Sequence, residues 1–305
     1  MDILIFIVSM GALIYGADFI IEQSEKIALH YKISPFVIGA TLVALGTSLP
    51  EMAVSMSASI KGSGDIAVAN VIGSTIFNIA LVLGSVFIVS KKIKPDRDLF
   101  AKDSAWALFP ILVFILMGID GKLNALDGIL FLILMGAYLT FLIGSNQVEE
   151  IDEDLAKEKF AWGKSSIMLL IGFVLTIAGA DFAIDSASNI AREFGVSEWM
   201  IGLFLVAFGT SLPELTISIK AALNNNADLA IGNIIGSNVA NFTMVLGLSS
   251  IVNTLNVDLS ANFFDISAAF ILSLMLVFIT ANKLYNKSAG IVLMVVLGLV
   301  IQNSL

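Results

Sequence analysis

Apolar stretches long enough to cross a lipid bilayer follow one another along nearly the whole chain, separated by short polar loops. A spanning helix needs about 20 predominantly apolar residues. The pattern therefore predicts an all-α integral membrane protein with ten transmembrane helices. We expect these helices at about residues 2–23, 35–60, 66–89, 104–120, 125–144, 162–190, 197–223, 227–252, 263–281 and 287–303.

Composition narrows the class of protein further. Of the 305 residues, 58% are hydrophobic and 13% are charged, whereas soluble domains carry about 25% charged residues. This balance argues against a soluble enzyme and a nucleic-acid-binding protein. The chain has no cysteine and a single histidine, His30, so thiolate and multi-histidine metal sites are excluded. The first apolar stretch starts at Asp2 without a basic segment, and we expect it to be a retained span rather than a signal peptide.

Lysine and arginine accumulate in cytoplasmic loops and so set the orientation. With the N-terminus outside, 13 of the 16 basic residues fall on the cytoplasmic side, and only Lys61, Lys122 and Arg192 fall outside. We therefore predict that both termini face out. An acidic cytoplasmic linker, residues 146–161, is then expected to join a first half (1–145) to a second half (162–305).

Three sequence blocks recur at one spacing, which indicates a duplication. GTSLPE at 46–51 returns at 209–214, NVIGS at 70–74 returns as NIIGS at 233–237, and GADF at 16–19 returns at 179–182, each 163 residues later. Because each half holds five spans, the second copy enters the membrane from the opposite side. Inverted repeats are an architecture of secondary transporters, which bind their cargo near the midplane.

Each GTSLPE block is predicted to break its helix. Pro50 has no N–H to donate to the carbonyl of Gly46, and its ring crowds that carbonyl. Pro213 repeats the arrangement. Broken helices at membrane depth are tolerated where the backbone lines a cavity or coordinates an ion. We expect carbonyls around 44–47 and 207–210 to be freed for this purpose.

Glu51 and Glu214 are the central candidates, because a carboxylate deep in a span is costly and points to function. Hydroxyls share a helix face with each of them, and the following span in each half adds a stripe of amides and hydroxyls at i, i+4 and i+8. Gly73 and Gly236 in those spans are expected to allow close helix contact. The polar groups are Thr47, Ser48, Ser55, Asn70, Ser74 and Asn78, and Thr210, Ser211, Ser218, Asn233, Ser237 and Asn241.

Together these groups form an all-oxygen cage with two negative charges. Calcium binds six to eight such oxygens, and Na⁺ can use the same ligands. The cage holds no soft ligand for zinc, copper or iron and no basic residue for an anion. The predicted cargo is therefore a cation.

The paired GTSLPE and N-[VI]-I-G-S-x-x-x-N blocks resemble the two α-repeats of the sodium/calcium exchangers of the cation/calcium antiporter superfamily, in their compact prokaryotic form. The resemblance implies an antiporter that exchanges Na⁺ for Ca²⁺, with no cofactor. It also implies that Glu51 and Glu214 are shared ligands for the two ions. The remaining ligands that it implies are Thr47, Ser48, Ser74, Asn78, Thr210, Ser211, Ser237 and Asn241, with the carbonyls of Ala44, Thr47, Ala207 and Thr210.

Asn241 departs from part of that family, since some relatives, including K⁺-dependent exchangers, carry Asp there. Asn removes a titratable group and suggests K⁺-independent, electrogenic exchange. Asp18 and Asp181 lie near span ends, and we interpret them as solvated at the interface rather than ion-binding. We expect a functional monomer in the plasma membrane, in contact with the lipid bilayer and without nucleic acid.

Several alternatives stay open from the sequence. H⁺/Ca²⁺ exchange, or antiport of another divalent cation, is the nearest, although a proton carrier would not need the Ser and Thr hydroxyls. An intramembrane hydrolase usually uses a pair of aspartates and a positioned water. A channel fits enclosed midplane carboxylates less well than alternating access does.

Overall fold

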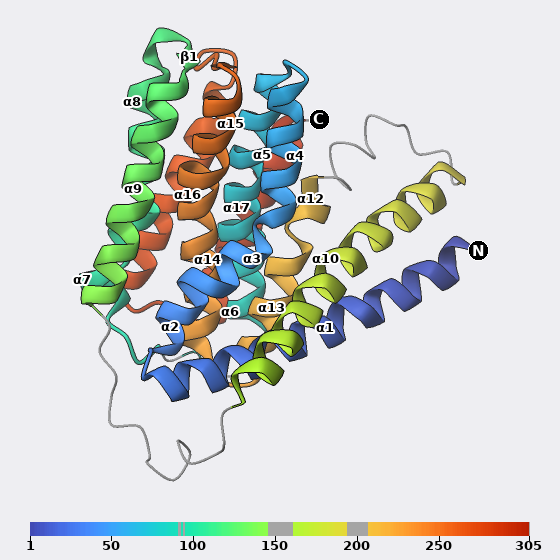
Figure 1. Ribbon diagram of the computed structural model, residues 1–305. Helices are drawn as coiled ribbons and strands as arrows, with labels where there is room; N and C mark the ends of the chain where they lie inside the picture. The colour runs from blue at the N-terminus through green and yellow to red at the C-terminus, as the bar shows by residue number, and fades with distance from the viewer. Residues whose placement is uncertain (91–92, 94, 146–160, 194–206, 305) are drawn as a thin grey trace.

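The computed structural model describes residues 1–90, 93, 95–145, 161–193 and 207–304 and is almost entirely helical (Figure 1). Six of its helices are long and apolar enough to cross a membrane, or seven if one bent pair counts as a single span. The six are Asp2–Tyr31, Gly64–Val89, Ala125–Gly144, Trp162–Ala183, Ala227–Val252 and Phe263–Ala281. The fold is therefore that of a multi-pass helical membrane protein.

The other expected spans differ in how far the described residues cover them. The bent pair Pro35–Thr47 and Leu49–Ile60 corresponds to the second expected span, and two shorter apolar helices, Ser104–Asp120 and Lys287–Asn303, correspond to the fourth and tenth. The first part of the span expected at 197–223, and nearly all of the linker at 146–161, lie outside the described residues. The number ten thus stays a prediction.

The first half of the chain begins with one long helix and a broken helix, and further helices and one short strand follow. Its elements are α1 (Asp2–Tyr31), α2 (Pro35–Ile38), η1 (Gly39–Val43), α3 (Ala44–Thr47), α4 (Leu49–Ile60), α5 (Gly64–Ile76), η2 (Phe77–Leu83), α6 (Gly84–Val89), α7 (Leu99–Lys102), η3 (Ser104–Ala107), α8 (Phe109–Met117), η4 (Gly118–Asp120), β1 (Lys122–Leu123) and α9 (Ala125–Gly144).

The second half repeats the long helix, the broken helix and the helix with a π-turn, but its short strand comes before α16 and not before the last helix. Its described elements are α10 (Trp162–Glu193), α12 (Ala207–Thr210), α13 (Leu212–Leu223), α14 (Ala227–Ala240), η7 (Asn241–Val245), α15 (Leu246–Val252), β2 (Leu255–Asn256), α16 (Phe263–Ala281) and α17 (Lys287–Ser304). The pair α3–α4 and the pair α12–α13 have the same bounds once the offset of 163 residues is applied. The duplication seen in the sequence is therefore also a duplication of local structure.

Both GTSLPE blocks interrupt their helices at the serine. Ser48 has φ −82° and ψ 7°, and Ser211 has φ −90° and ψ 3°, so both leave the helical region in the same way. Pro50 and Pro213 then lie in the first turn of the next helix, where a missing N–H is tolerated. The break between α3 and α4 bends the chain by 45°. The predicted helix breaks are confirmed in geometry.

Wide π-helical turns follow the NxIGS blocks in both halves. Asn78 lies in η2 and Asn241 lies at the start of η7. A π-turn carries one residue more than an α-turn and is frequently found at functional sites. Residues 241–245 map to 78–82 under the offset of 163, so the turns occupy matching positions.

Helix α14 lies at the centre of the molecule, and every one of its residues is buried. Its glycines permit backbone contact with the broken helix of the first half: a Cβ on Gly236 would collide with the Ala40 carbonyl oxygen, and one on Gly232 with that of Phe36. A Cβ on Gly73 would meet no atom within 4 Å in the described part of the chain. Close approach is therefore seen for Gly236 and not for Gly73.

Helices α1 and α10 lie side by side and cross the remaining bundle at an angle (Figure 1). Glycines bring them into contact, since a Cβ on Gly16 would lie 2.7 Å from the Gly172 carbonyl oxygen, and one on Gly179 would lie 2.8 Å from that of Ser9. Asp18 of α1 forms an ion pair with Lys220 of α13. Asp18 is thus paired, not merely solvated as the sequence suggested.

Arg97 ties four segments together at one end of the bundle. Its guanidinium donates to the fully buried Asp103 at 2.5 and 2.9 Å, donates to Ser145 at the end of α9, and lies over the Phe36 ring. The backbone amide of Arg97 also donates to Asp228 in the first turn of α14. Burial raises the pKa of the Asp103 carboxyl, while the hydrogen bonds from Arg97 act in the opposite direction. This cluster fixes the start of α14, the helix that carries half of the polar stripe.

At the other end, β1 and β2 form a two-residue antiparallel pair, with Lys122 opposite Asn256 and Leu123 opposite Leu255. The pair links the loop before α9 to the loop before α16. It joins the two halves at the end of the bundle opposite α7, the short helix that follows Arg97 (Figure 1).

Candidate ion-binding site

The two helix breaks bring the GTSLPE blocks of both halves together. Ser48 Oγ donates to Glu214 Oε1 at 3.5 Å, so the break of the first half reaches the carboxylate of the second. The Thr47 and Ser237 hydroxyls also lie beside Glu214. In the reciprocal direction, Thr210 lies beside Glu51. Each carboxylate is therefore surrounded by hydroxyls of both repeats.

Glu51 and Glu214 are both completely buried, with 0% exposure. They are near enough for their charges to repel one another. Neither forms an ion pair with a Lys, Arg or His within the described residues. Two buried carboxylates without a basic partner need a proton or a metal cation to offset their charge, because desolvated charge is costly unless it is compensated.

Many oxygens around this pair have no hydrogen-bond partner among the described residues, although buried polar groups are nearly always satisfied. Both carboxylate oxygens of Glu51 and one of Glu214 are in this state. They are joined by the Ser74 and Ser211 hydroxyls and by amide oxygens on the two π-turns, Asn78 Oδ1 and Asn241 Oδ1. The orphaned atoms are predominantly acceptors, which is the chemistry of cation ligands.

The predicted carbonyl ligands are less open than expected. The Ala44 carbonyl oxygen accepts the Ser48 amide at 3.0 Å and the Thr47 hydroxyl at 3.2 Å. The Thr47 hydroxyl has one proton and also lies 3.3 Å from Asn233 Oδ1, so it donates to one of these two acceptors at a time. When it donates to Ala44, it competes with an ion for that carbonyl oxygen. Ala207 begins α12 at the matching position.

Sequence reasoning left Asn238 out of the site. Its Oδ1 accepts from Asn78 Nδ2 at 3.0 Å, while its own Nδ2 has no partner in the described chain. Asn238 follows Ser237 directly, but its counterpart in the first half is Thr75, so it is not one of the residues that the duplication repeats. A signal was present, since this asparagine stands one helical turn before Asn241.

Asn70 and Asn233 hold the broken helices in place. Asn70 Nδ2 donates to Ser55 Oγ at 2.9 Å and to the Glu51 carbonyl at 3.3 Å. Asn233 Nδ2 donates to Ser218 Oγ at 3.0 Å, and its Oδ1 accepts from Thr47 at 3.3 Å. The repeated asparagines therefore position the helices that carry the glutamates.

The arrangement suits a hard cation that is bound by two carboxylates and several neutral oxygens. No group of three or more His, Cys, Asp or Glu that could hold a metal occurs in the part of the chain that the structure describes. The centre has two carboxylates, several hydroxyls and the amides of three asparagines. Hydroxyl, amide and carboxylate oxygens are ligands for Ca²⁺, and soft metals prefer sulfur or imidazole.

This chain matches known proteins over nearly its full length. The family model described as sodium/calcium exchanger protein matches residues 1–144 and 164–304. An uncharacterized membrane protein of Methanocaldococcus jannaschii is 38% identical over 286 residues, covering 94% of this chain and 92% of that protein. The sodium/calcium exchanger MaX1 of Methanosarcina acetivorans is 30% identical over 341 residues, covering 96% and 95%.

Among solved structures, the sodium-calcium exchanger NCX_Mj soaked with 10 mM Na⁺ and zero Ca²⁺ matches with a TM-score of 0.87 and 36% identity, covering 99% of this chain and 98% of that one. The sequence and the helical membrane fold agree with these matches. The chain therefore belongs to the sodium/calcium exchanger family, whose members are membrane transporters rather than enzymes.

Proposed function

We propose that this protein is an antiporter that moves Ca²⁺ against Na⁺ by alternating access. The observation that carries the proposal is the pair of buried glutamates, Glu51 and Glu214, with unpartnered oxygens around them and no basic residue paired with them in the described chain. Such a centre attracts one divalent cation or several monovalent ones, and these compete for the same oxygens. Competition for shared ligands is what couples the two fluxes.

The ion ligands in this proposal are those that the sequence and its resemblance supply, with Asn238 added. Glu51 and Glu214 serve both ions, and the hydroxyls and amides complete the shell. The full set is Thr47, Ser48, Ser74, Asn78, Thr210, Ser211, Ser237, Asn238 and Asn241, with carbonyls of Ala44, Thr47, Ala207 and Thr210 as further candidates.

The proposed topology has ten spans, two inverted five-span halves at 1–145 and 162–305, and both termini outside. The distribution of Lys and Arg supports the orientation. Two matched stretches of the family model, 1–144 and 164–304, fall on the same two halves. We place the protein in the plasma membrane as a functional monomer.

The moving parts in this proposal are α1 and α10, which slide against a core formed by α2–α6 and α12–α15. All the proposed ligands lie on the core elements. The ring of Phe173 in α10 lies directly against Gly46 at the helix break, where a Cβ would collide with it. Movement of α10 would therefore alter access to the break without dismantling the ligand shell.

The transport cycle is proposed to be electrogenic and independent of K⁺. A centre with two negative charges is balanced by one Ca²⁺, whereas additional Na⁺ would carry net positive charge. Asn241 adds no charge that would require K⁺. The rival, H⁺/Ca²⁺ exchange, would replace Na⁺ by protons on the glutamates.

The deciding experiment is ⁴⁵Ca²⁺ uptake into proteoliposomes that hold the purified protein. We expect uptake with an outward Na⁺ gradient and none above background with an outward H⁺ gradient of the same size. Uptake that follows only the H⁺ gradient would establish the rival, and absence of uptake with both would exclude Ca²⁺ antiport. Liposomes with Glu51→Gln protein serve as the matched control for leak.

A further inference from the structure

The broken helices and the π-turns of the two halves match, yet the long helices α1 and α10 are docked differently. Helix α1 packs along α13 of the other half. Under the duplication, the corresponding contact would be made by α10 with α4, but the described residues of α10 touch α12 and α13 and make no comparable contact with α4. One of two equivalent interfaces is closed and the other is open.

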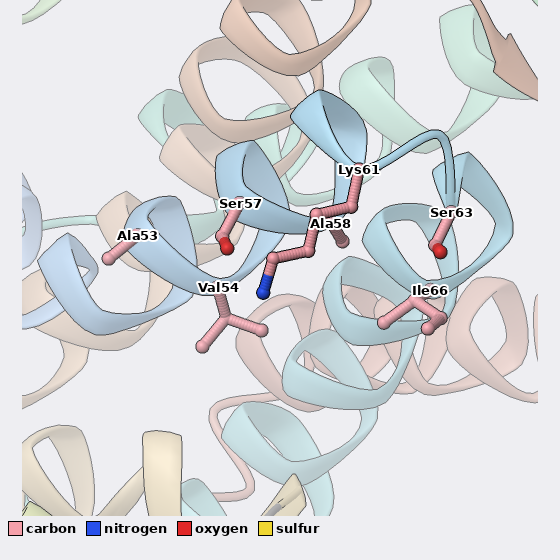
Figure 2. A pocket seen from close by; sticks show the side chains of 7 residues that line it. All are labelled: Ala53, Val54, Ser57, Ala58, Lys61, Ser63 and Ile66. Carbon is pink, nitrogen blue, oxygen red and sulfur yellow. The ribbon is translucent and has the colours of Figure 1, made fainter.

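Burial of equivalent side chains gives the same result. Ile217 on α13 is fully buried at 0% exposure, whereas its counterpart Val54 on α4 is 37% exposed. The exposed face of α4 borders a cavity of about 460 Å³ (Figure 2). Its lining is Ala53, Val54, Ser57, Ala58, Lys61, Ser63 and Ile66.

The closed interface carries an ion pair that the open one lacks. Lys220 of α13 pairs with Asp18 of α1 and donates to the Ile14 carbonyl oxygen at 3.0 Å. Asp18 and Asp181 are equivalent positions in the GADF blocks, and Asp181 is exposed. The position equivalent to Lys220 on α4 is Ser57, which has no charge.

Lys61, the residue that follows the last residue of α4, carries a positive charge one helical turn beyond Ser57. Figure 2 shows its side chain running back along the helix, so that the ammonium lies beside Ser57 and Val54 inside the cavity. Lys61 and Asp181 form no ion pair within the described chain. Lys61 therefore stands at the end of α4 and Asp181 on α10, the two helices of the interface that is open here.

We propose that Asp18–Lys220 and Asp181–Lys61 are two alternating ionic latches of the exchange cycle. The first holds α1 on α13 in the conformation described here. In the opposite conformation, α10 fills the cavity on α4, Asp181 pairs with Lys61, and Asp18 separates from Lys220. This inference rests on the proposed alternating access. The four residues of the two pairs would set the equilibrium between the two conformations.

Latches of this kind bias the equilibrium without locking it. Lys220 and Asp18 are 24% and 47% exposed, and a partly exposed ion pair changes an equilibrium by about fivefold or less. Removing either pair should therefore shift the population of the two conformations by about fivefold, in opposite directions. A stronger pair would slow the cycle by trapping one conformation.

The test uses cysteine reporters, which the chain permits because it has no native cysteine. Ile217→Cys reports release of α1 from α13, and Val54→Cys reports docking of α10. Each purified protein is reacted with a water-soluble maleimide, alone and with Lys220→Met, Lys61→Met or Asp181→Asn. Lys122→Met, at an exposed lysine of β1, is the matched control.

We expect Lys61→Met and Asp181→Asn each to slow labelling at position 217 about fivefold and Lys220→Met to speed it, while the reporter at position 54 responds in the opposite sense. Lys61 lies on a different helix from position 217, so its substitution can affect labelling there only through the conformational balance.

Labelling at position 217 that is the same with Lys61→Met, Asp181→Asn and Lys122→Met would overturn the latch. Labelling needs no transport, so a response of the reporter at position 217 in a protein that fails to exchange Na⁺ for Ca²⁺ would support the latch and reject the function.

Discussion

At the residue scale, the two glutamates carry the largest predicted effect. Glu51→Gln or Glu214→Gln removes half of the formal charge of the proposed ion site, and buried charge interactions are worth several kcal/mol. Since about 1.4 kcal/mol is a factor of ten, we expect Ca²⁺ affinity to fall by about a hundredfold or more and uptake to stop. Isothermal titration and ⁴⁵Ca²⁺ flux measure this. Glu22→Gln on the exposed face of α1 is the control, and near-normal uptake by either site mutant would remove that residue from the centre.

Asn241 gives a second prediction at the same scale. Asn241→Asp adds a carboxylate to the centre, and that group either takes up a proton or requires a further cation. We expect the mutant to transport with a steeper pH dependence between about pH 6 and 8 and to respond to K⁺, while the parent protein does neither. Reversal potentials of both proteins with and without K⁺ measure the difference, with Asn282→Asp as control. A K⁺ requirement or an electroneutral cycle in the parent would contradict our interpretation of Asn241.

The sequence was informative about residues wherever the duplication repeated them. Glu51, Glu214 and the flanking hydroxyls could be predicted, because two copies of one motif single out the same positions. Asn238 could not, since its counterpart is Thr75 and only the packing of α14 against η2 shows that it meets Asn78. The hydrogen bond from the Thr47 hydroxyl to the Ala44 carbonyl could not be predicted either, because it depends on the rotamer of Thr47.

At the scale of elements, the prolines are predicted to maintain the helix breaks. Proline in a helix interior costs about 3 kcal/mol, so Pro50→Ala or Pro213→Ala favours a continuous helix by a similar amount. Straightening would carry the neighbouring glutamate away from the opposite break. We expect Ca²⁺ uptake to fall about tenfold or more, while Pro35→Ala at the start of α2 has little effect. Normal uptake by both mutants would show that the breaks persist without proline.

The helix breaks could be predicted from Gly and Pro, but the π-turns could not. Nothing in the composition of residues 77–83 distinguishes a π-turn from an α-turn, because the extra residue is accommodated by packing of the whole bundle. The two turns orient Asn78 and Asn241, so part of the site's geometry depends on an element that sequence patterns do not reveal.

At the scale of the whole molecule, the orientation is open to direct measurement. With both termini outside, a cysteine introduced by Ala101→Cys beside the Arg97 cluster should be protected from impermeant maleimide in intact cells. A cysteine introduced by Lys122→Cys, at the end that carries β1, should be labelled. The physical reason is the concentration of Lys and Arg on the side that is predicted to stay in the cytoplasm. Labelling at position 101 but not at position 122 would reverse the topology.

The different docking of the two halves was beyond sequence reasoning for a physical reason. The repeated motifs leave open whether α1 or α10 is docked, because this is a property of the conformation. The sequence therefore predicted a helical membrane protein of the sodium/calcium exchanger family but not its conformation. The difference in burial between Val54 and Ile217 reveals which of the two helices is docked.

The buried carboxylates also have a consequence for the durability of the fold. A ligand that binds only the native state adds about 2.7 kcal/mol to the free energy of unfolding at one hundred times its dissociation constant. Two uncompensated charges in the core should make the protein hard to maintain in chelator without Na⁺, and Ca²⁺ or Na⁺ should raise its melting temperature in detergent. In the Glu51→Gln, Glu214→Gln double mutant the melting temperature should become independent of both ions and should exceed that of the ion-free parent. The cargo of this transporter would then also be its folding ligand, so that Na⁺ protects the protein from unfolding whenever Ca²⁺ has left.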